Sequence, residues 1–161
     1  MKRELQQTAD GSHTLFIPEM DEHYHSVNGA VQESRHVFIE AGLHHHTGKE
    51  LVVFEIGFGT GLNAFLTLLD AEKNERVVNY YSIELYPLEP GLVQALNYGE
   101  VVCPEKKELF RALHAAAWNQ EVAITGRFTL HKIQGDSNTC DLPEGIGLVY
   151  FDAFAPDKQP E

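Results

Sequence analysis

The stretch LVVFEIGFGTGLN, residues 51–63, decides how this sequence folds. Residues 51–56 are nearly all apolar and rich in β-branched side chains, which is typical of a strand buried inside a parallel sheet. Three glycines follow at alternate positions, and after them apolar residues recur at helical spacing. This order of strand, glycine turn and helix predicts an α/β fold that binds a ligand at the turn.

The rest of the chain repeats the alternation of strand and helix. We expect further strands over 77–85, 127–133 and 146–151, and further helices over 88–98 and 104–119. Strands that alternate with helices indicate a parallel sheet of βαβ units, and in such sheets ligands lie beyond the carboxyl ends of the strands. The sequence therefore predicts a Rossmann-like α/β sheet.

Residues 1–48 precede this sheet and have a different pattern. Asp10-Gly11 lies between the strand-like runs 4–8 and 14–17, which predicts a β-hairpin. A helix is expected over 30–43. We therefore divide the chain into an N-terminal hairpin, loop and helix over 1–48 and a Rossmann-like core over 49–161. Because only about ten residues follow the last expected strand, we expect this core to be partial, with a sheet that is incomplete at its C-terminus.

The glycine turn itself indicates the cofactor. Glycines let the backbone turn sharply and let a ligand approach the main chain, but a dinucleotide fingerprint needs G-x-G-x-x-G and position 62 is leucine. Glu55 would repel a pyrophosphate, whereas it can hold the ammonium of a methionine moiety directly or through water. Charge thus favours S-adenosylmethionine over NAD. The predicted cofactor residues of this turn are Glu55, Gly57, Phe58, Gly59, Thr60, Gly61 and Asn63.

Acidic residues end the other expected strands. Glu84 is placed to accept hydrogen bonds from two ribose hydroxyls. Asp136, followed by Ser137, is placed to receive the adenine amino group, and either residue can also cap a short turn. Asp152 would lie opposite the sulfonium. There it can hold an acceptor amine and help remove its proton, although a helix cap or a cofactor-side carboxylate is also open for Asp152.

Four segments resemble one family, the methyltransferase that makes 5-methylaminomethyl-2-thiouridine at the tRNA wobble position. They are Tyr24-His25-Ser26 with Gly29-Ala30 and 33–38, then 55–63, 81–88 and 152–156. The resemblance implies a class I S-adenosylmethionine-dependent methyltransferase of the stand-alone type, truncated at its C-terminus. It implies that the amine of 5-aminomethyl-(2-thio)uridine in the anticodon loop is methylated after an upstream tRNA-modifying enzyme has supplied the aminomethyl group. Independently of the resemblance, two cysteines, too few for a disulfide framework, and a polar start without an export signal predict a cytoplasmic protein.

Tyr24, His25 and Ser26 form the predicted substrate side of the site. They belong to a polar, aromatic loop ahead of the sheet, where a ring can stack on a flipped uracil. The alternative is a packed loop that holds the helix over 30–43 in place. The sequence leaves both interpretations open.

Charge argues against the tRNA interpretation and keeps others open. The 161 residues carry a formal net charge of −12, and the cations are scattered, whereas an RNA-binding surface is normally basic. An acidic surface suits a methyltransferase or aminopropyltransferase that acts on a small free amine, and a non-catalytic cofactor-binding module is a third possibility. No apolar run reaches the ~20 residues of a membrane span. His44-His45-His46 lacks an acidic partner at ligand spacing, so no metal site is predicted.

Overall fold

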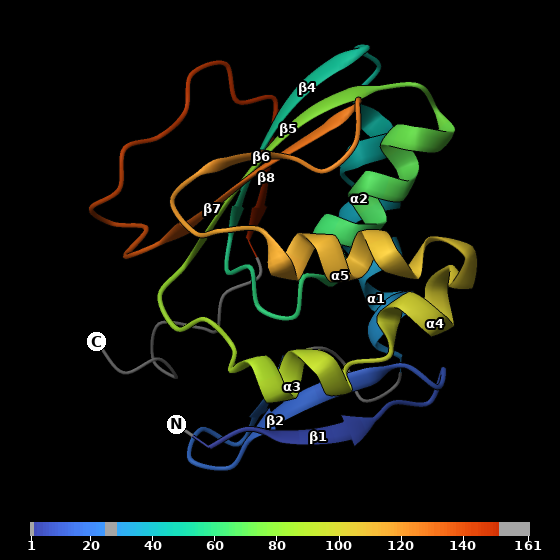
Figure 1. The fold of residues 1–161 in the computed structure, drawn as a ribbon, viewed down its shortest axis with the longest axis vertical. Helices are drawn as coiled ribbons and strands as arrows, with labels where there is room; N and C mark the ends of the chain where they lie inside the picture. The colour runs from blue at the N-terminus through green and yellow to red at the C-terminus, as the bar shows by residue number, and fades with distance from the viewer. Residues whose placement is uncertain (1, 25–28, 152–161) are drawn as a thin grey trace.

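The larger of two sheets organises the protein (Figure 1). The computed structural model describes residues 2–24 and 29–151. The strands of this sheet are β4 (Glu50–Ile56), β5 (Val77–Glu84), β6 (Glu121–Ala123), β7 (Phe128–Gln134) and β8 (Leu148–Phe151). They lie in the order β6-β7-β5-β4-β8; all are parallel except the edge strand β6, which runs antiparallel to β7. This topology confirms the predicted Rossmann-like α/β fold.

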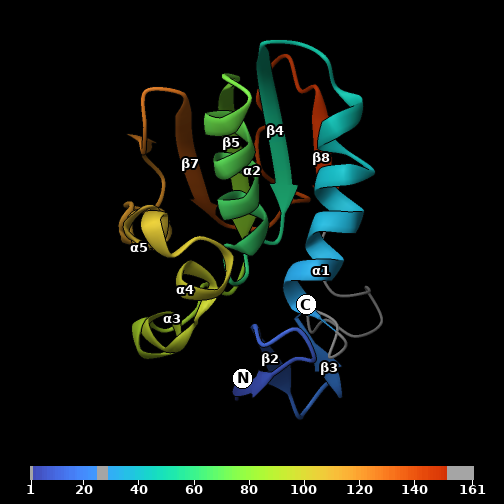
Figure 2. The same ribbon diagram turned by 90° about the vertical axis from the view of Figure 1, so that its right-hand side faces the viewer.

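Helices cover one face of this sheet and form the core with it. Figure 2 shows α1 (Ala30–Ser34), α2 (Leu62–Lys73) and α5 (Lys107–Ala115) on the same side. Val53, Tyr80 and Leu130, one from each central strand, belong to the same buried cluster as α2. Burying one such side chain contributes about 1.5–3 kcal/mol, so a slip of one residue in any strand would be costly. The core therefore fixes where each strand ends.

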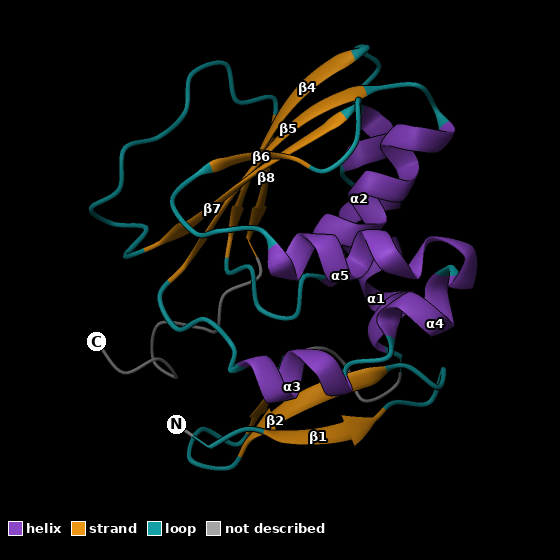
Figure 3. Ribbon diagram, viewed as in Figure 1, coloured by secondary structure: helices purple, strands orange, loops and turns teal. Residues whose placement is uncertain are grey.

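A second, antiparallel sheet forms the N-terminal part of the chain. Its strands are β1 (Glu4–Gln7), β2 (His13–Ile17) and β3 (Glu22–His23). The β1–β2 pair confirms the predicted hairpin around Asp10-Gly11, and Gly11 has the positive φ, 86°, that the turn requires. In Figure 3 this sheet lies next to α3 (Pro90–Ala95).

The predicted helix over 88–98 is wrong, because two short helices replace it. α3 begins at Pro90, and α4 (Tyr98–Val102) begins only after a break at Leu96 and Asn97. The Asn97 side chain accepts a hydrogen bond from the amide of His13 at 2.9 Å and donates one to the carbonyl of Gly11 at 3.0 Å. The break thus attaches this segment to the hairpin, a contact that local helix propensity does not encode.

Two further helices are shorter than predicted. The expected helix over 30–43 leaves α-helical geometry after Ser34 and continues as a π-helical segment, Arg35–Glu40, and a 3-10 turn, Leu43–His45. The expected helix over 104–119 is a 3-10 turn, Pro104–Lys106, followed by α5, which ends at Ala115. Beyond it the chain turns toward the sheet, where the amide of Asn119 donates to the carbonyl of Lys132 at 2.6 Å. Ala117, which a helix over 104–119 would include, lies beyond the end of α5 and is exposed.

Candidate cofactor site

The ends of three parallel strands meet at one edge of the large sheet. The amide of Gly57, after β4, donates to the carbonyl of Ile83 in β5 at 2.8 Å. The amide of Gly135, after β7, donates to the carbonyl of Glu84 at 3.1 Å. The turns that follow β4, β5 and β7 are thus held side by side, at the edge where open α/β sheets bind their ligands.

The turn after β4, residues 57–61, is called the glycine loop below. Gly57, Gly59 and Gly61 have φ angles of 93°, 54° and 79°, a region that residues with a Cβ rarely adopt. The amide of Gly61 donates to the carbonyl of Phe58 at 3.0 Å, and α2 begins directly afterwards. The first amides of this twelve-residue helix have no partner within the helix, so its N-terminus favours a polar ligand at the loop.

Two side chains approach the glycine loop so closely that a Cβ would be crowded at Gly59 and would clash at Gly61. A Cβ on Gly59 would lie 3.2 Å from Cδ2 of Tyr24, and one on Gly61 would lie 2.8 Å from Nε2 of His114. Backbone conformation thus favours glycine at both positions, and packing against His114 adds to this at Gly61. Tyr24 directly follows β3 and His114 belongs to α5, so distant parts of the chain shape the loop.

Glu84 lies at the end of β5 and contacts the glycine loop. Its Oε2 accepts a hydrogen bond from the amide of Gly59 at 2.8 Å, and its Oε1 accepts one from the amide of Tyr86 at 3.0 Å. Burial raises the pKa of this carboxyl, and the backbone donors oppose the rise. A carboxylate has about four lone-pair positions, so Glu84 keeps some acceptor capacity beside its backbone donors, and its contact with two ribose hydroxyls stays a prediction.

The other predicted residues of the loop support it from inside. Glu55 is 1% exposed, and its Oε1 accepts a hydrogen bond from the hydroxyl of Ser82 at 2.7 Å. Thr60 and Asn63 are also buried. These side chains lie beneath the loop, and contact of Glu55 with a methionine ammonium remains a prediction.

Asp136 and Ser137 lie in a turn beyond β7. Oδ1 of Asp136 accepts a hydrogen bond from the amide of Asn138 at 2.8 Å, and its carbonyl accepts one from the amide of Thr139 at 3.1 Å. The predicted turn-capping role is therefore present. The predicted contact of Asp136 with adenine stays a prediction, as does any role of Ser137.

Of the predicted substrate-side and catalytic residues, only Tyr24 lies within the described part. His25, Ser26 and Asp152 fall outside the described residues. The Tyr24 ring covers the glycine loop at Gly59. Burial raises the pKa of its hydroxyl to about 12, while the nearby charge of Arg3 acts in the opposite direction. Stacking of Tyr24 on a uracil remains a prediction.

His114 is a residue of this site that the sequence analysis missed. Its Nε2 lies 2.7 Å from the carbonyl oxygen of Thr60. A carbonyl only accepts hydrogen bonds, so Nε2 carries the proton and donates. Burial lowers the pKa of His114 to about 4, which leaves the ring neutral near pH 7. The ring also packs edge-on against Phe58, with centroids 5.4 Å apart. His114 therefore ties α5 to the glycine loop.

Lys132 supports His114 from β7. Its Nζ donates to the carbonyl of His114 at 2.9 Å and lies 4.7 Å from the ring centroid of Trp118 and 5.4 Å from that of Phe58. The residue is 1% exposed, and burial lowers its pKa to about 8. The only sequence signal was its place in the strand, because Lys132 shares the inward face with the buried Phe128 and Leu130.

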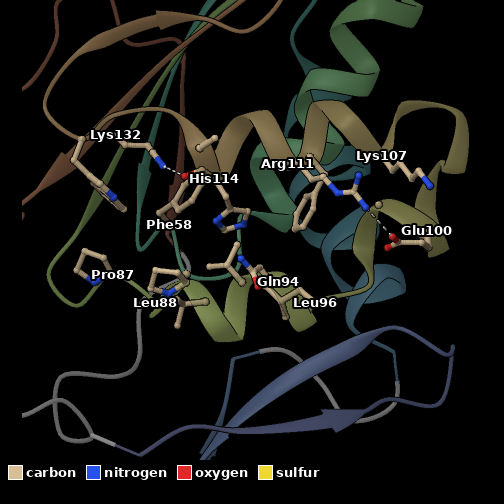
Figure 4. A pocket seen from close by; sticks show the side chains of 17 residues that line it. Phe58, Pro87, Leu88, Gln94, Leu96, Glu100, Lys107, Arg111, His114 and Lys132 are labelled. Atoms are coloured by element: carbon tan, nitrogen blue, oxygen red, sulfur yellow. Dashed lines mark hydrogen bonds and ion pairs between the residues drawn. The ribbon is translucent and has the colours of Figure 1, made fainter.

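A cavity of about 560 Å³ adjoins the glycine loop between α3 and α5 (Figure 4). Phe58 and Gly59 form its boundary with the loop, and His114 projects into its centre. At one end of the cavity lie the apolar side chains of Pro87 and Leu88. Lys107 and Arg111 lie at the opposite end, where Arg111 pairs with Glu100 at 3.9 Å. In the part of the chain that the structure describes, no group of three or more His, Cys, Asp or Glu could hold a metal ion. No helix there is long and apolar enough to cross a membrane.

The sheet order, the glycine loop and the carboxylate of Glu84 define a Rossmann-like α/β domain with a candidate cofactor site at the carboxyl edge of its sheet. No protein-family model matches the sequence. Several relatives named tRNA 5-methylaminomethyl-2-thiouridine biosynthesis bifunctional protein MnmC do match. The protein from Magnetococcus marinus is 30% identical over 92% of this chain, that from Ectopseudomonas mendocina 31% over 88%, and that from Vibrio cholerae 32% over 88%.

A solved structure agrees with these sequence relatives. The crystal structure of MNMC2 from Aquifex aeolicus superimposes with a TM-score of 0.75 at 26% identity, covering 98% of this chain and 51% of that one. Over most of its length the chain is therefore similar to MnmC proteins. It spans about a quarter of the length of the curated relatives, between 23% and 24% for these three.

Proposed function

We propose that the protein transfers a methyl group from S-adenosylmethionine to the primary amine of 5-aminomethyl-2-thiouridine at the wobble position of tRNA. The observation that carries this proposal is the glycine loop joined to Glu84, in a chain related along most of its length to proteins of 5-methylaminomethyl-2-thiouridine biosynthesis. We further propose that the protein acts in the cytoplasm, on tRNA to which an earlier modifying enzyme has added the aminomethyl group.

The described residues fit S-adenosylmethionine better than a dinucleotide. Glu84 would hold the ribose hydroxyls, and the positive-φ glycines leave main-chain amides accessible beside it. Glu55 lies below the same loop, and two carboxylates would repel a pyrophosphate. When bound, this cofactor supplies an electrophilic methyl group.

The protein's own contribution to such a transfer is to position and deprotonate the amine. An amine with a free pKa of about 10 must lose a proton before it can act as a nucleophile. We assign that role to Asp152, which follows β8 in the sequence, because a carboxylate beside the amine can orient it and accept the proton. Tyr24, His25 and Ser26 are assigned to the substrate side, where Tyr24 covers the loop.

A small free amine is the second candidate substrate. The net charge of −12 favours a cationic small molecule over a polyanion, because long-range attraction concentrates cations at an acidic surface. A polyamine would fit this description. The relatives' shared involvement with tRNA favours the first candidate.

The deciding experiment is a nucleoside mass assay. The protein is incubated with S-adenosylmethionine and tRNA that carries 5-aminomethyl-2-thiouridine, beside the Vibrio cholerae relative as a positive control. A gain of one methyl group on that nucleoside is expected. If the relative methylates the tRNA and this protein does not, although it binds S-adenosylhomocysteine, the tRNA assignment is refuted, and the same assay is repeated with spermidine.

A further inference from the structure

Arg3, next to the start of β1, has a buried side chain although it lies almost at the chain terminus. That side chain is 4% exposed. Its Nη2 donates to the carbonyl of Tyr86 at 2.9 Å, and its Nη1 donates to Oε1 of Glu89 at 3.2 Å. Both partners belong to the segment that follows β5. The guanidinium thus spans from the N-terminal sheet to the segment beside the cofactor site.

The neighbours of Arg3 connect it to the glycine loop by two routes. Along the first, Arg3 hydrogen-bonds the hydroxyl of Tyr24, whose ring covers Gly59. Along the second, Arg3 holds the carbonyl of Tyr86, whose amide donates to Glu84. Glu84 in turn accepts the amide of Gly59 at 2.8 Å. The two routes form a closed ring of contacts that includes Gly59 and Glu84, the residue assigned to the cofactor ribose.

Burying a guanidinium in this position has a cost in free energy that an exposed side chain would not have. Removing a charge from water is costly unless fixed partners compensate it, and Nε of Arg3 has no hydrogen-bond partner among the described residues. Lys2 shows the inexpensive alternative next in sequence: its side chain is 70% exposed and pairs with Glu4 at 3.1 Å. The planar fork of Arg3 can serve a carbonyl, a carboxylate and a hydroxyl at once, which a lysine does less well.

We propose that Arg3 is a positioning residue for cofactor binding. It seats the N-terminal sheet so that Tyr24 covers the glycine loop, and it holds Tyr86 so that Glu84 stays oriented toward the ribose. The proposal rests on the proposed function, since it requires the cofactor at this loop. Coupling between two sites is reciprocal. A ligand at the glycine loop must therefore stabilise the contact between the N-terminal sheet and that loop.

The test compares Arg3→Met with Lys2→Met, which removes the same charge from the neighbouring, exposed residue. The dissociation constant for S-adenosylhomocysteine is measured by calorimetry. Arg3→Met is expected to weaken binding about tenfold, as loss of charge-assisted hydrogen bonds does, while Lys2→Met stays within about twofold of the unmodified protein. Arg3→Lys, which keeps the charge, is expected to recover part of the affinity.

Hydrogen exchange provides a readout that a merely structural role would not change. S-adenosylhomocysteine is expected to slow amide exchange in β1 and β2 of the unmodified protein and of Lys2→Met, but not of Arg3→Met. Equal affinities for Arg3→Met and Lys2→Met, or ligand protection of the hairpin that persists in Arg3→Met, would overturn the proposal. If Arg3→Met does not fold, the comparison of Arg3→Lys with Lys2→Met decides by the same criteria. Failure of the unmodified protein to bind S-adenosylhomocysteine would instead refute the proposed cofactor.

Discussion

Replacing His114 by phenylalanine tests the hydrogen bond that ties α5 to the glycine loop. Phenylalanine keeps a ring that can pack edge-on against Phe58 and Phe110, whose centroids lie 5.4 and 5.0 Å from that of His114. It removes the Nε2–H group that donates to the carbonyl of Thr60 at 2.7 Å. The change therefore isolates the donor, with little loss of packing.

The expected magnitude depends on pH. Near pH 7, losing this donor should lower the free energy of unfolding by about 1–3 kcal/mol. The pKa of His114 is about 4 in the folded protein and 6.5 in the unfolded chain, so the unfolded state binds more protons as the pH falls below 6.5. At about 1.4 kcal/mol per pKa unit, acidification from pH 7 to 4.5 should cost the unmodified protein about 2.4 kcal/mol through this residue alone. His114→Phe does not incur that cost.

Urea unfolding followed by circular dichroism, at pH 7 and at pH 4.5, measures both effects. His114→Phe should be the less stable protein at pH 7, and the difference should vanish or reverse at pH 4.5. His114→Gln, which retains an N–H donor but cannot titrate, should lose less stability at pH 7. A difference between the unmodified protein and His114→Phe that is the same at both pH values would refute the assignment of a buried, neutral histidine.

Three further predictions concern the same site. Lys132→Met removes a buried ammonium whose pKa is about 8, below its usual 10.5. The unmodified protein should therefore gain stability relative to this variant as the pH rises from 8 to 10.5, and a constant difference in urea unfolding would contradict this. Gly61→Ala should lower the free energy of unfolding by about 1–3 kcal/mol, because the added Cβ would lie 2.8 Å from Nε2 of His114 at a φ of 79°. Thermal unfolding should show little change for the control Gly126→Ala, since a Cβ at Gly126 would meet no atom within 4 Å. Glu84→Gln should weaken S-adenosylhomocysteine binding about tenfold by calorimetry, and an unchanged affinity would remove Glu84 from the site.

Local sequence patterns predicted those helices, strands and turns that neighbouring residues in the sequence determine. The apolar run ending at Ile56, the glycines of the loop and the helical spacing after Gly61 correspond to β4, the loop and α2. The Asp10-Gly11 hairpin follows from turn chemistry in the same way. Glu84 was identified because a polar residue ended an otherwise apolar strand, and its contact with Gly59 agrees with that interpretation.

Contacts between distant residues account for what the sequence did not predict. The break at Asn97 depends on partners more than eighty residues away, His13 and Gly11, so the local pattern predicted one continuous helix. Strand β6 has three residues and lies at the sheet edge, where alternation of apolar and polar residues is too short to detect. Arg3 and His114 reach the site across 83 and 54 residues of sequence. No spacing rule connects such pairs before the fold is known.

The most direct test of the central claim is a calorimetric titration of the protein with S-adenosylhomocysteine and, separately, with NAD. The glycine loop and Glu84 predict that one molecule of S-adenosylhomocysteine binds per chain and that NAD does not bind. Binding of NAD, or no binding of S-adenosylhomocysteine, would contradict the assignment of this loop to a methyltransferase cofactor.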